Sequence, residues 1–334
     1  MSGKSVDEAF HAVLRRLQAA NSLVVLTHAR PDGDGLGSMV AFTRAARAAG
    51  RGAQMFLLDA VPRRYQFLFA GERTDPTEQF VSMADQADVI VILDTCALSQ
   101  LGKIEEAIGR RRDRLVVVDH HATSDDLTTA QWIDISAAAT GVMVGEIIQA
   151  LNWPIDLAAA EALVTAAMSD TGWLQFANTD SRCLRAVAEW LQAGVRMDKL
   201  YKKLYQSDRP ERLRLMVRML QSLELHCNGR LAAMILRRPD FEQTGAVPAE
   251  TENLINEALR IGSVETVVLL VENDHGVRVS LRSRDRVDVS AVAAHFGGGG
   301  HRRAAGIRSA EDLGILKQQV IEACAQELGR SEST

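Results

Sequence analysis

Three short apolar runs that each end in a carboxylate or imidazole residue constrain the fold of this chain most. The runs and the residues that follow them are Leu23–Thr27 with His28, Val89–Leu93 with Asp94, and Leu115–Val118 with Asp119. Continuous, largely β-branched runs of this length are typical of strands buried on both faces of a parallel sheet. The carboxyl ends of such strands meet at one edge, where open α/β folds bind their ligands. We therefore expect these polar residues to lie together.

Helical patterns separate these strands, and a second set of strands follows further along the chain. The sequence predicts an α/β fold in three parts: a mainly parallel-sheet domain at 1–195, a helical connector at 196–225 and a smaller α/β domain at 226–334. The connector is Leu-, Arg- and Lys-rich and broken at Asp208-Arg209-Pro210. We expect the active site to lie in the cleft between the two domains.

The amino-acid composition of the chain limits the kinds of molecule that it is expected to bind. The 334 residues carry a formal charge of −5, which does not favour a broad grip on long nucleic acid. The first twenty residues lack the apolar core of a secretory signal, and no apolar run approaches the length of a membrane span. Four widely spaced cysteines suit free thiols better than a disulfide framework. We expect a cytoplasmic protein with no membrane partner, and assign the cysteines no role.

The segment from His28 to Ser38 is the first candidate site. It places His28, Asp32 and Asp34 on a Pro- and Gly-rich turn, ahead of a helix expected from Met39 to Ala49. Alternate side chains of such a turn can converge on a cation. An Asp-Gly loop that caps the next helix is an equally good interpretation of this segment alone.

Three further positions can also be interpreted either as metal ligands or as structural residues. Asp94 follows a buried strand, where an unpaired carboxylate is costly, but it could simply cap the helix near Ala97. In Asp119-His120-His121, adjacent side chains point to opposite faces, so one histidine can bind a metal, although a His pair is more often structural. Asp170 ends an Ala-rich helix and could be a turn residue. Trp173, Phe176 and Asn178 follow it and could contact a base, although packing is the better interpretation of the two aromatic residues.

Taken together, these motifs resemble the DHH phosphoesterase superfamily. The matching residues are His28, Asp32 and Asp34, then Asp94, then Asp119-His120-His121, and then Asp170. The resemblance continues in Ser280-Leu281-Arg282-Ser283 and in the segment from Phe296 to Gly306, which look like the DHH-associated C-terminal domain. It implies that one divalent cation is held by His28, Asp32 and Asp94, and a second by Asp34, Asp94, His120 and Asp170.

The resemblance also implies how such a site works. The family usually uses Mn²⁺, with Mg²⁺ or Co²⁺ as alternatives, to activate water and neutralise charge on the phosphoryl group. Asp94 would bridge the cations as a catalytic residue, and His121 would donate a hydrogen bond to a substrate oxygen. The implied substrate-binding residues of the second domain are Arg282, Ser283, Gly298, Gly299, Gly300 and His301.

Size and domain plan favour the nanoRNase branch of this family. Its members hydrolyse short single-stranded RNA to mononucleotides and dephosphorylate 3′-phosphoadenosine 5′-phosphate (pAp). A soluble phosphodiesterase for cyclic or linear dinucleotides is the nearest alternative, and a noncatalytic nucleotide-binding sensor is the alternative from another class. A RecJ-like exonuclease or a manganese pyrophosphatase fits the chain less well. By the same resemblance we expect a homodimer.

Overall fold

A computed structural model describes residues 6–75, 79–122 and 124–330, without the side chains of Asp75 and His301. The chain forms two compact units, Met1–Ser207 and Asp208–Thr334. The segment expected as a connector, 196–225, is divided between them. Its helix α8 (Met197–Tyr205) belongs to the first unit and α9 (Pro210–Gln221) to the second.

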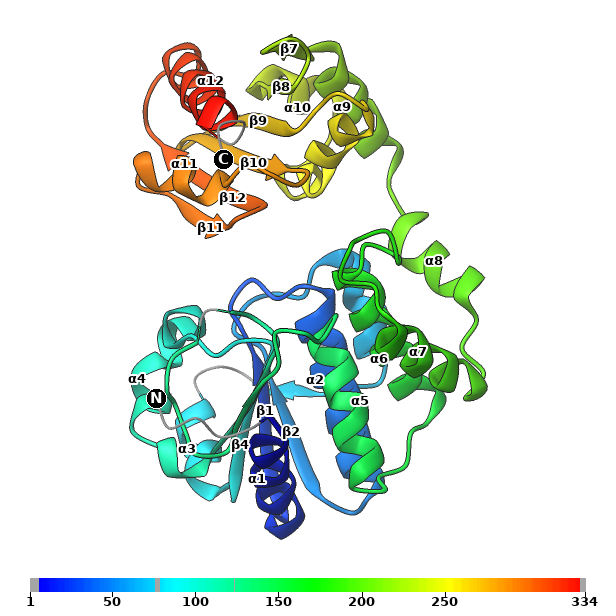
Figure 1. The fold of residues 1–334 in the computed structure, drawn as a ribbon. Coiled ribbons are helices and arrows are strands. Elements are labelled where there is room, and N and C mark those ends of the chain that lie inside the picture. Colours follow the sequence, from blue (N-terminus) through cyan, green and yellow to red (C-terminus); the bar gives the residue numbers. More distant parts are fainter. Residues whose placement is uncertain (1–5, 76–78, 123, 331–334) are drawn as a thin grey trace. The chain divides into compact units, whose positions relative to one another are not determined.

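The first unit is built on a six-stranded parallel sheet (Figure 1). Its strands are β1 (Ser22–Thr27), β2 (Gly52–Phe56), β3 (Thr74–Asp75), β4 (Val89–Leu93), β5 (Leu115–Asp119) and β6 (Gln131–Ile133). The order β3-β2-β1-β4-β5-β6 reverses between β1 and β4, and such a switch point leaves a crevice at the strand ends. The three strands expected from the sequence are confirmed, and so is the α/β class with a mainly parallel sheet.

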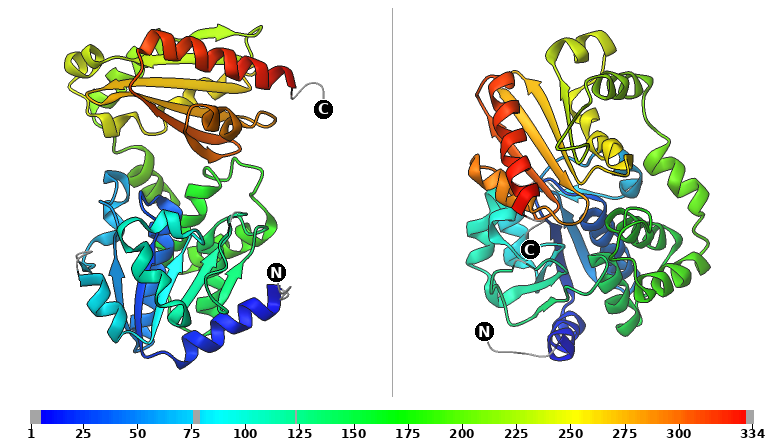
Figure 2. Two further views of the ribbon diagram at one scale, coloured as in Figure 1. Left: turned by 90° about the vertical axis from the view of Figure 1, so that its left-hand side faces the viewer. Right: turned by 45° about the horizontal axis from the view of Figure 1, so that its top comes forward.

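Helices cover both faces of this sheet (Figure 2). The described α-helices are α1 (Val6–Ala19), α2 (Gly33–Ala48), α3 (Phe80–Gln86), α4 (Glu105–Gly109), α5 (Thr140–Ala150), α6 (Leu157–Asp170) and α7 (Ser181–Gln192). Successive strand residues point to opposite faces, so Val25 and Val91 join the core beneath α2, α5 and α6. Ile90 and Ile92 join a second core on the side of α3.

Helix α2 begins earlier than the sequence suggests. The prediction of a turn up to Ser38 is wrong, because α2 starts at Gly33 and Asp32 caps it by accepting hydrogen bonds from the amides of Asp34 and Gly35. The glycines permit a close approach that no side chain would allow. A Cβ on Gly37 would lie 2.4 Å from the carbonyl oxygen of Ala162 in α6. Helix packing therefore overrides the low helix propensity of glycine here.

The second unit has a mixed six-stranded sheet in the order β11-β12-β10-β9-β8-β7. Its elements are β7 (Glu224–His226), β8 (Leu231–Leu236), α10 (Arg238–Thr244), β9 (Thr266–Asn273), β10 (Gly276–Ser283), α11 (Val289–His295), β11 (Gly299–His301), β12 (Ala304–Ser309) and α12 (Leu313–Arg330). Strand β7 was not expected, and part of the glycine tract forms the edge strand β11 instead of a turn.

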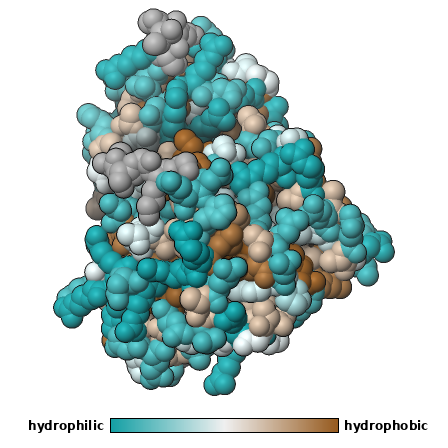
Figure 3. All heavy atoms as spheres, turned by 60° about the horizontal axis from the view of Figure 1, so that its bottom comes forward, coloured by the Kyte–Doolittle hydropathy of each residue, from teal (hydrophilic) through white to brown (hydrophobic). Residues whose placement is uncertain are grey.

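Figure 3 shows how hydrophilic and hydrophobic residues are distributed on one face of the molecule. The face in Figure 3 is mostly hydrophilic, with smaller hydrophobic areas among the polar side chains. Among the described residues, no helix is both long and apolar enough to cross a lipid bilayer.

Candidate metal centre

The first polar cluster forms where β1 and β4 end side by side. Thr27 pairs with Leu93, so His28 and Asp94 leave the sheet as neighbours at the switch point. The Nε2 atom of His28 lies 3.5 Å from Oδ2 of Asp94 and 3.9 Å from Oδ1 of Asp32. The other ring nitrogen, Nδ1, lies 2.9 Å from the carbonyl oxygen of Ala29. That contact orients the ring and leaves Nε2 facing the two carboxylates.

The backbone of Asp94 is unusual. Its φ is +64°, a left-handed conformation that is uncommon for a residue other than glycine. The residue is 2% exposed, and its Oδ1 accepts a hydrogen bond from Oγ1 of Thr140 at 2.9 Å. Strained backbone persists where the surroundings enforce it, and it clusters at functional sites. Here it fixes a buried carboxylate at the end of β4.

Asp34 lies in the first turn of α2 and is fully buried. Its carboxylate accepts hydrogen bonds from the backbone amides of Thr140 at 2.6 Å and Gly141 at 2.9 Å, and from Oγ of Ser38 at 3.1 Å. The two amides belong to the N-terminus of α5, where the helix dipole favours negative charge. Helix α5 therefore holds the carboxylate that α2 carries.

His120 and Asp170 complete the cluster from β5 and α6. The Nδ1 atom of His120 lies 3.1 Å from the carbonyl oxygen of Ala137. Its Nε2 lies 3.0 Å from Oδ2 of Asp170 and 3.7 Å from a carboxylate oxygen of both Asp34 and Asp94. This nitrogen is buried, and Asp170 is the nearest of its charged neighbours. It lies among three carboxylates.

The structure brings all six expected metal ligands together. Potential ligand atoms lie within 4.8 Å of one another in three groups: His28, Asp32 and Asp94; Asp34, His120 and Asp170; and Asp94, His120 and His121. The first two groups correspond to the two cation sites expected from the sequence. Asp94 belongs to the first group and lies 3.7 Å from His120 of the second, which is compatible with a bridging position.

Burial and neighbouring carboxylates together shift the pKa values in the cluster. Burial raises the pKa of Asp34 to about 7, with a further contribution from Asp170. Burial, followed by the charge of Asp34, raises the pKa of Asp94 well above its ordinary value. Burial on its own would lower the pKa of His120, but Asp170, Asp34 and Asp94 around it raise it to about 10. The protonated forms of the two acids are thus favoured first by burial, and that of His120 by the carboxylates.

A divalent cation fits this donor set. Over the described parts of the chain, no Lys or Arg side chain forms an ion pair with Asp32, Asp34, Asp94 or Asp170. Buried carboxylates need a compensating charge, and metal coordination is a usual one. A mixture of carboxylates and imidazoles suits Mn²⁺ and neighbouring metals better than Ca²⁺.

Two domain families and several known proteins match the sequence of this chain. The N-terminal domain of the DHH family matches residues 22–169, and the DHHA1 domain matches residues 228–328. A Thermus thermophilus protein named bifunctional oligoribonuclease and PAP phosphatase NrnA is 32% identical over 92% of this chain and 91% of its own length. The chain belongs to the DHH family. A Bacillus subtilis protein of the same name is 24% identical over 88% of this chain and 91% of its own length.

A solved structure agrees with this assignment at the level of the fold. The crystal structure of an exopolyphosphatase-related protein from Bacteroides fragilis matches with a TM-score of 0.92 and covers 98% of both chains, at 22% identity. The two domain matches and the Thermus thermophilus relative confirm the predicted resemblance to DHH phosphoesterases. The solved structure and the domain matches confirm the two-domain plan of a parallel-sheet domain followed by a smaller mixed-sheet domain.

His121 differs from the six expected metal ligands because its ring is held by Asp119, a carboxylate outside that set. Its Nδ1 lies 2.7 Å from Oδ1 of Asp119 and 3.8 Å from Oδ1 of Asp94, and the ring is about one-third exposed. The contact with Asp119 orients the ring. Sequence reasoning gave Asp119 no role, although carboxylate–imidazole pairs commonly set the orientation of a functional histidine.

Sequence reasoning missed Thr140 for a different reason, and it considered Asn178 only as a possible contact to a base. Thr140 contacts Asp94 through its hydroxyl and Asp34 through its amide. Asn178 donates from Nδ2 to the carbonyl oxygens of Ala138 and Asp170. These contacts join segments far apart in the chain. A Thr-Gly pair at a helix start is the only local signal, and it is weak.

The candidate substrate residues of the DHHA1 domain lie on or beside β10, β11 and β12. Arg282 is mostly buried, and burial lowers its pKa. Its guanidinium donates to the carbonyl oxygen of Leu281, and no ion pair of Arg282 is present among the described residues. The hydroxyl of Ser283 instead donates to Oε1 of Glu265 at 3.2 Å. The expected role of Ser283 thus competes with an internal contact.

The glycine tract is more ordered than a flexible turn. A Cβ on Gly298 would lie 2.2 Å from the carbonyl oxygen of Gly306, and Gly300 has a φ of +147° with Ala304 close by. Gly299 pairs with Gly306 in the β-ladder. The side chain of His301, also expected to bind substrate, lies outside the described part of the structure.

Proposed function

We propose that this chain hydrolyses short oligoribonucleotides to mononucleotides and removes a phosphate from pAp. Its relatives from Thermus thermophilus and Bacillus subtilis are named for these two activities and match it over most of their lengths. The observation that carries the proposal is the cluster of four carboxylates and two imidazoles at the switch point of the parallel sheet, in which Asp34 and Asp94 are buried. Membership of the DHH family supports a phosphoesterase role for this cluster.

The proposal assigns the ligands as the sequence suggested. His28, Asp32 and Asp94 would hold one divalent cation, and Asp34, Asp94, His120 and Asp170 the other. We propose Mn²⁺ as the natural metal, with Mg²⁺ or Co²⁺ as substitutes. When bound, such cations lower the pKa of water and neutralise charge on a phosphoryl group.

The protein's own side chains would prepare the site for this chemistry. Thr140 and Gly141 hold Asp94 and Asp34 in place, and backbone carbonyls orient His28 and His120 so that each Nε2 faces the carboxylates. We propose that His121, oriented by Asp119, donates a hydrogen bond to an oxygen of the substrate phosphate. Preorganised donors cost no reorganisation during the reaction, which is why their orientation matters.

Arg282 is the proposed phosphate-binding residue of the second unit. A buried guanidinium with no carboxylate partner among the described residues is suited to an anionic ligand, because burial without a counter-charge is costly. Backbone of the Gly298–Gly300 segment would allow a phosphate to approach closely. Ser283 and His301 remain predicted contacts, and so do a homodimer and a cytoplasmic location.

The test is product formation from five substrates, with Mn²⁺ and with a chelator. They are a labelled RNA dinucleotide, a 24-mer, pAp, a cyclic dinucleotide and pyrophosphate. We expect metal-dependent turnover of the dinucleotide and pAp ahead of the 24-mer, and none with the Asp94→Ala variant. Preference for the cyclic dinucleotide or for pyrophosphate would keep the metal chemistry but replace the substrate. No turnover of any compound would favour a nucleotide-binding sensor.

A further inference from the structure

The segment from Thr171 to Asn178, called the 171–178 loop below, has an unusual backbone directly after Asp170. Gly172, Trp173 and Leu174 are left-handed in succession, with φ of +55°, +60° and +67°. Such a conformation is uncommon for Trp and Leu and persists only where the surroundings enforce it. The loop therefore has a specific shape that the protein maintains beside its metal centre.

Hydrogen bonds within the loop and to its neighbours hold that shape. The carbonyl oxygen of Thr171 accepts from the amides of Gln175 and Phe176, at 2.9 and 3.0 Å. At the other end of the loop, Nδ2 of Asn178 donates to the carbonyl oxygens of Ala138 and Asp170. The loop is consequently tied at both ends to the segment that carries Asp170.

Trp173 is the apolar anchor of the loop. Its ring packs edge-on against Tyr201 and Tyr205 of α8, with centroid distances of 5.1 and 5.6 Å. Edge-to-face pairs at such distances are favourable. The interpretation of Trp173 as a packing residue agrees with this contact.

Phe176 does not follow the same pattern, and its interpretation as a packing residue is wrong. The side chain is 54% exposed. It lies over Gly172, because a Cβ added to Gly172 would come within 2.5 Å of the phenyl ring. Gly172 is two residues from Asp170, so their Cα atoms are at most about 7 Å apart. A flat, exposed apolar ring thus covers a residue that is only two positions along the chain from a candidate metal ligand.

We propose that Phe176 is the base-stacking residue of this site and binds the nucleobase of the nucleotide whose phosphate is cleaved. The inference rests on the proposed function, since it needs a nucleotide at the metal centre. Every nucleobase has a π face, so stacking on a phenyl ring tolerates any sequence. Phe176 would therefore supply affinity for nucleotides over other phosphate esters without selecting among the bases.

The experiment compares pAp with its abasic analogue, which keeps the ribose and both phosphates but carries hydrogen in place of adenine. Loss of one base–aromatic stack should raise KM about tenfold. For Phe176→Ala we expect that increase with pAp, little change in kcat, and unaltered kinetics with the abasic analogue. The wild-type protein should prefer pAp to the analogue by a similar factor, and Phe176→Trp should keep that preference.

Leu184→Ala is the matched control, because Leu184 is a similarly exposed apolar residue, at 47%, on α7. We expect wild-type kinetics from it. Unchanged KM for pAp in Phe176→Ala would overturn the inference. Equal losses with pAp and the abasic analogue would also overturn it, since Phe176 would then act through the shape of the loop. Failure of the wild-type protein to cleave any phosphate ester would instead refute the proposed function, and this inference with it.

Discussion

The hydroxyl of Thr140 offers a sharp test of how the metal centre is assembled. Thr140→Val removes one hydrogen bond, from Oγ1 to Oδ1 of Asp94, and replaces the side chain by one of nearly the same shape. The amide of Thr140 remains bound to Asp34, so the start of α5 should keep its place. Any loss of cation affinity then reports on the orientation of Asp94.

The size of the effect follows from the charge of the acceptor. A hydrogen bond to a charged group contributes about 1.5–3 kcal/mol. If most of that energy serves to hold Asp94 for the cations, their affinity should fall about 10- to 100-fold, since 1.4 kcal/mol is a factor of ten. Removal of groups that orient metal ligands commonly has an effect of that order.

This change in affinity is measured by titrating the purified variant with Mn²⁺ in a calorimeter. The dependence of hydrolysis on Mn²⁺ concentration gives a second measurement. Thr43→Val is the matched control, because Thr43 is a buried helical threonine whose Oγ1 has no hydrogen-bond partner within the described ranges. It should bind Mn²⁺ like the wild type and be at least as stable. Wild-type affinity in Thr140→Val, or equal losses in both variants, would refute the reasoning.

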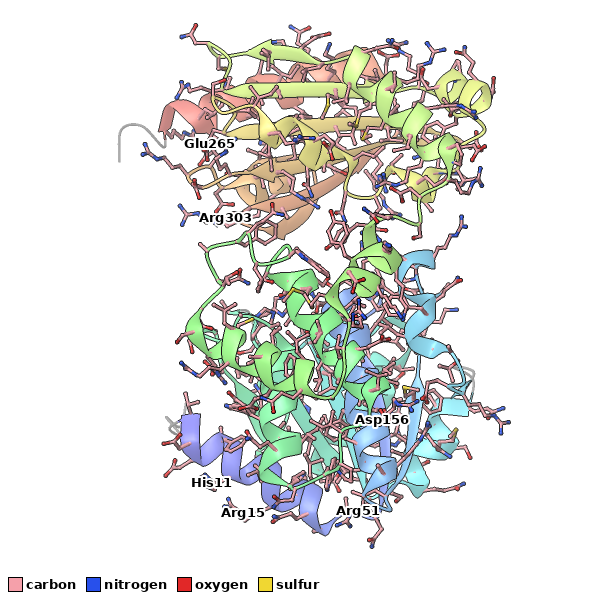
Figure 4. All side chains as sticks on the ribbon, turned by 90° about the vertical axis from the view of Figure 1, so that its right-hand side faces the viewer. His11, Arg15, Arg51, Asp156, Glu265 and Arg303 are labelled. Carbon is pink, nitrogen blue, oxygen red and sulfur yellow. The ribbon has the colours of Figure 1, made fainter. Side chains whose placement is uncertain are left out.

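Three other predictions concern stability and substrate. Adding Mn²⁺ at about 100 times its Kd should raise the Tm of the first unit by about 5–10 °C, as measured by calorimetry, and excess chelator should reverse the rise. Glu265, labelled in Figure 4, accepts hydrogen bonds from the amides of residues 285–287, and these bonds help to lower its pKa against the opposing effect of burial. The ionised form stabilises the fold at pH values above the unfolded pKa, and this stabilisation is lost as pH falls through the lowered pKa of the folded state. In urea unfolding, Glu265→Gln should therefore cost about 1 kcal/mol at pH 7 and progressively less as the pH is lowered. Arg282→Gln should raise KM for pAp while leaving bound metal, measured by elemental analysis, unchanged; an equal loss of metal would contradict its assignment as a phosphate-binding residue.

The sequence predicted those parts of the site that depend on local pattern. His28, Asp94 and His120 follow apolar strands directly, and a parallel sheet brings its strand ends to one edge whatever the details of packing. The predicted start of α2 was wrong because the true start depends on tertiary contacts. Gly35 and Gly37 disfavour a helix locally, yet only they allow α2 to pack as closely as it does on Thr27 and α6.

The contribution of α5 could not be predicted for a related reason. The amides of Thr140 and Gly141 bind a carboxylate 106 and 107 residues earlier in the chain. Every helix begins with unpaired amides, so a sequence cannot tell which helix start will meet a buried acid. The carboxylates can be recognised from their motifs, whereas the groups that make their burial tolerable are ordinary backbone.

This division of roles between motif carboxylates and backbone donors explains two properties of the site. Burying its charges costs free energy, and the site keeps its affinity for cations. Asp34 and Asp94 are buried near each other without an Arg or Lys partner in the described structure. Burial raises the cost of ionising both, as do the charge of Asp170 for Asp34 and the charge of Asp34 for Asp94. Neutral donors from α2 and α5 reduce that cost without cancelling the charge, so the cluster keeps its affinity for cations. A buried Arg or Lys would stabilise the carboxylates more strongly, but it would compete with the metal for them. Neutral donors therefore hold the carboxylates in place and leave their charge available to a cation.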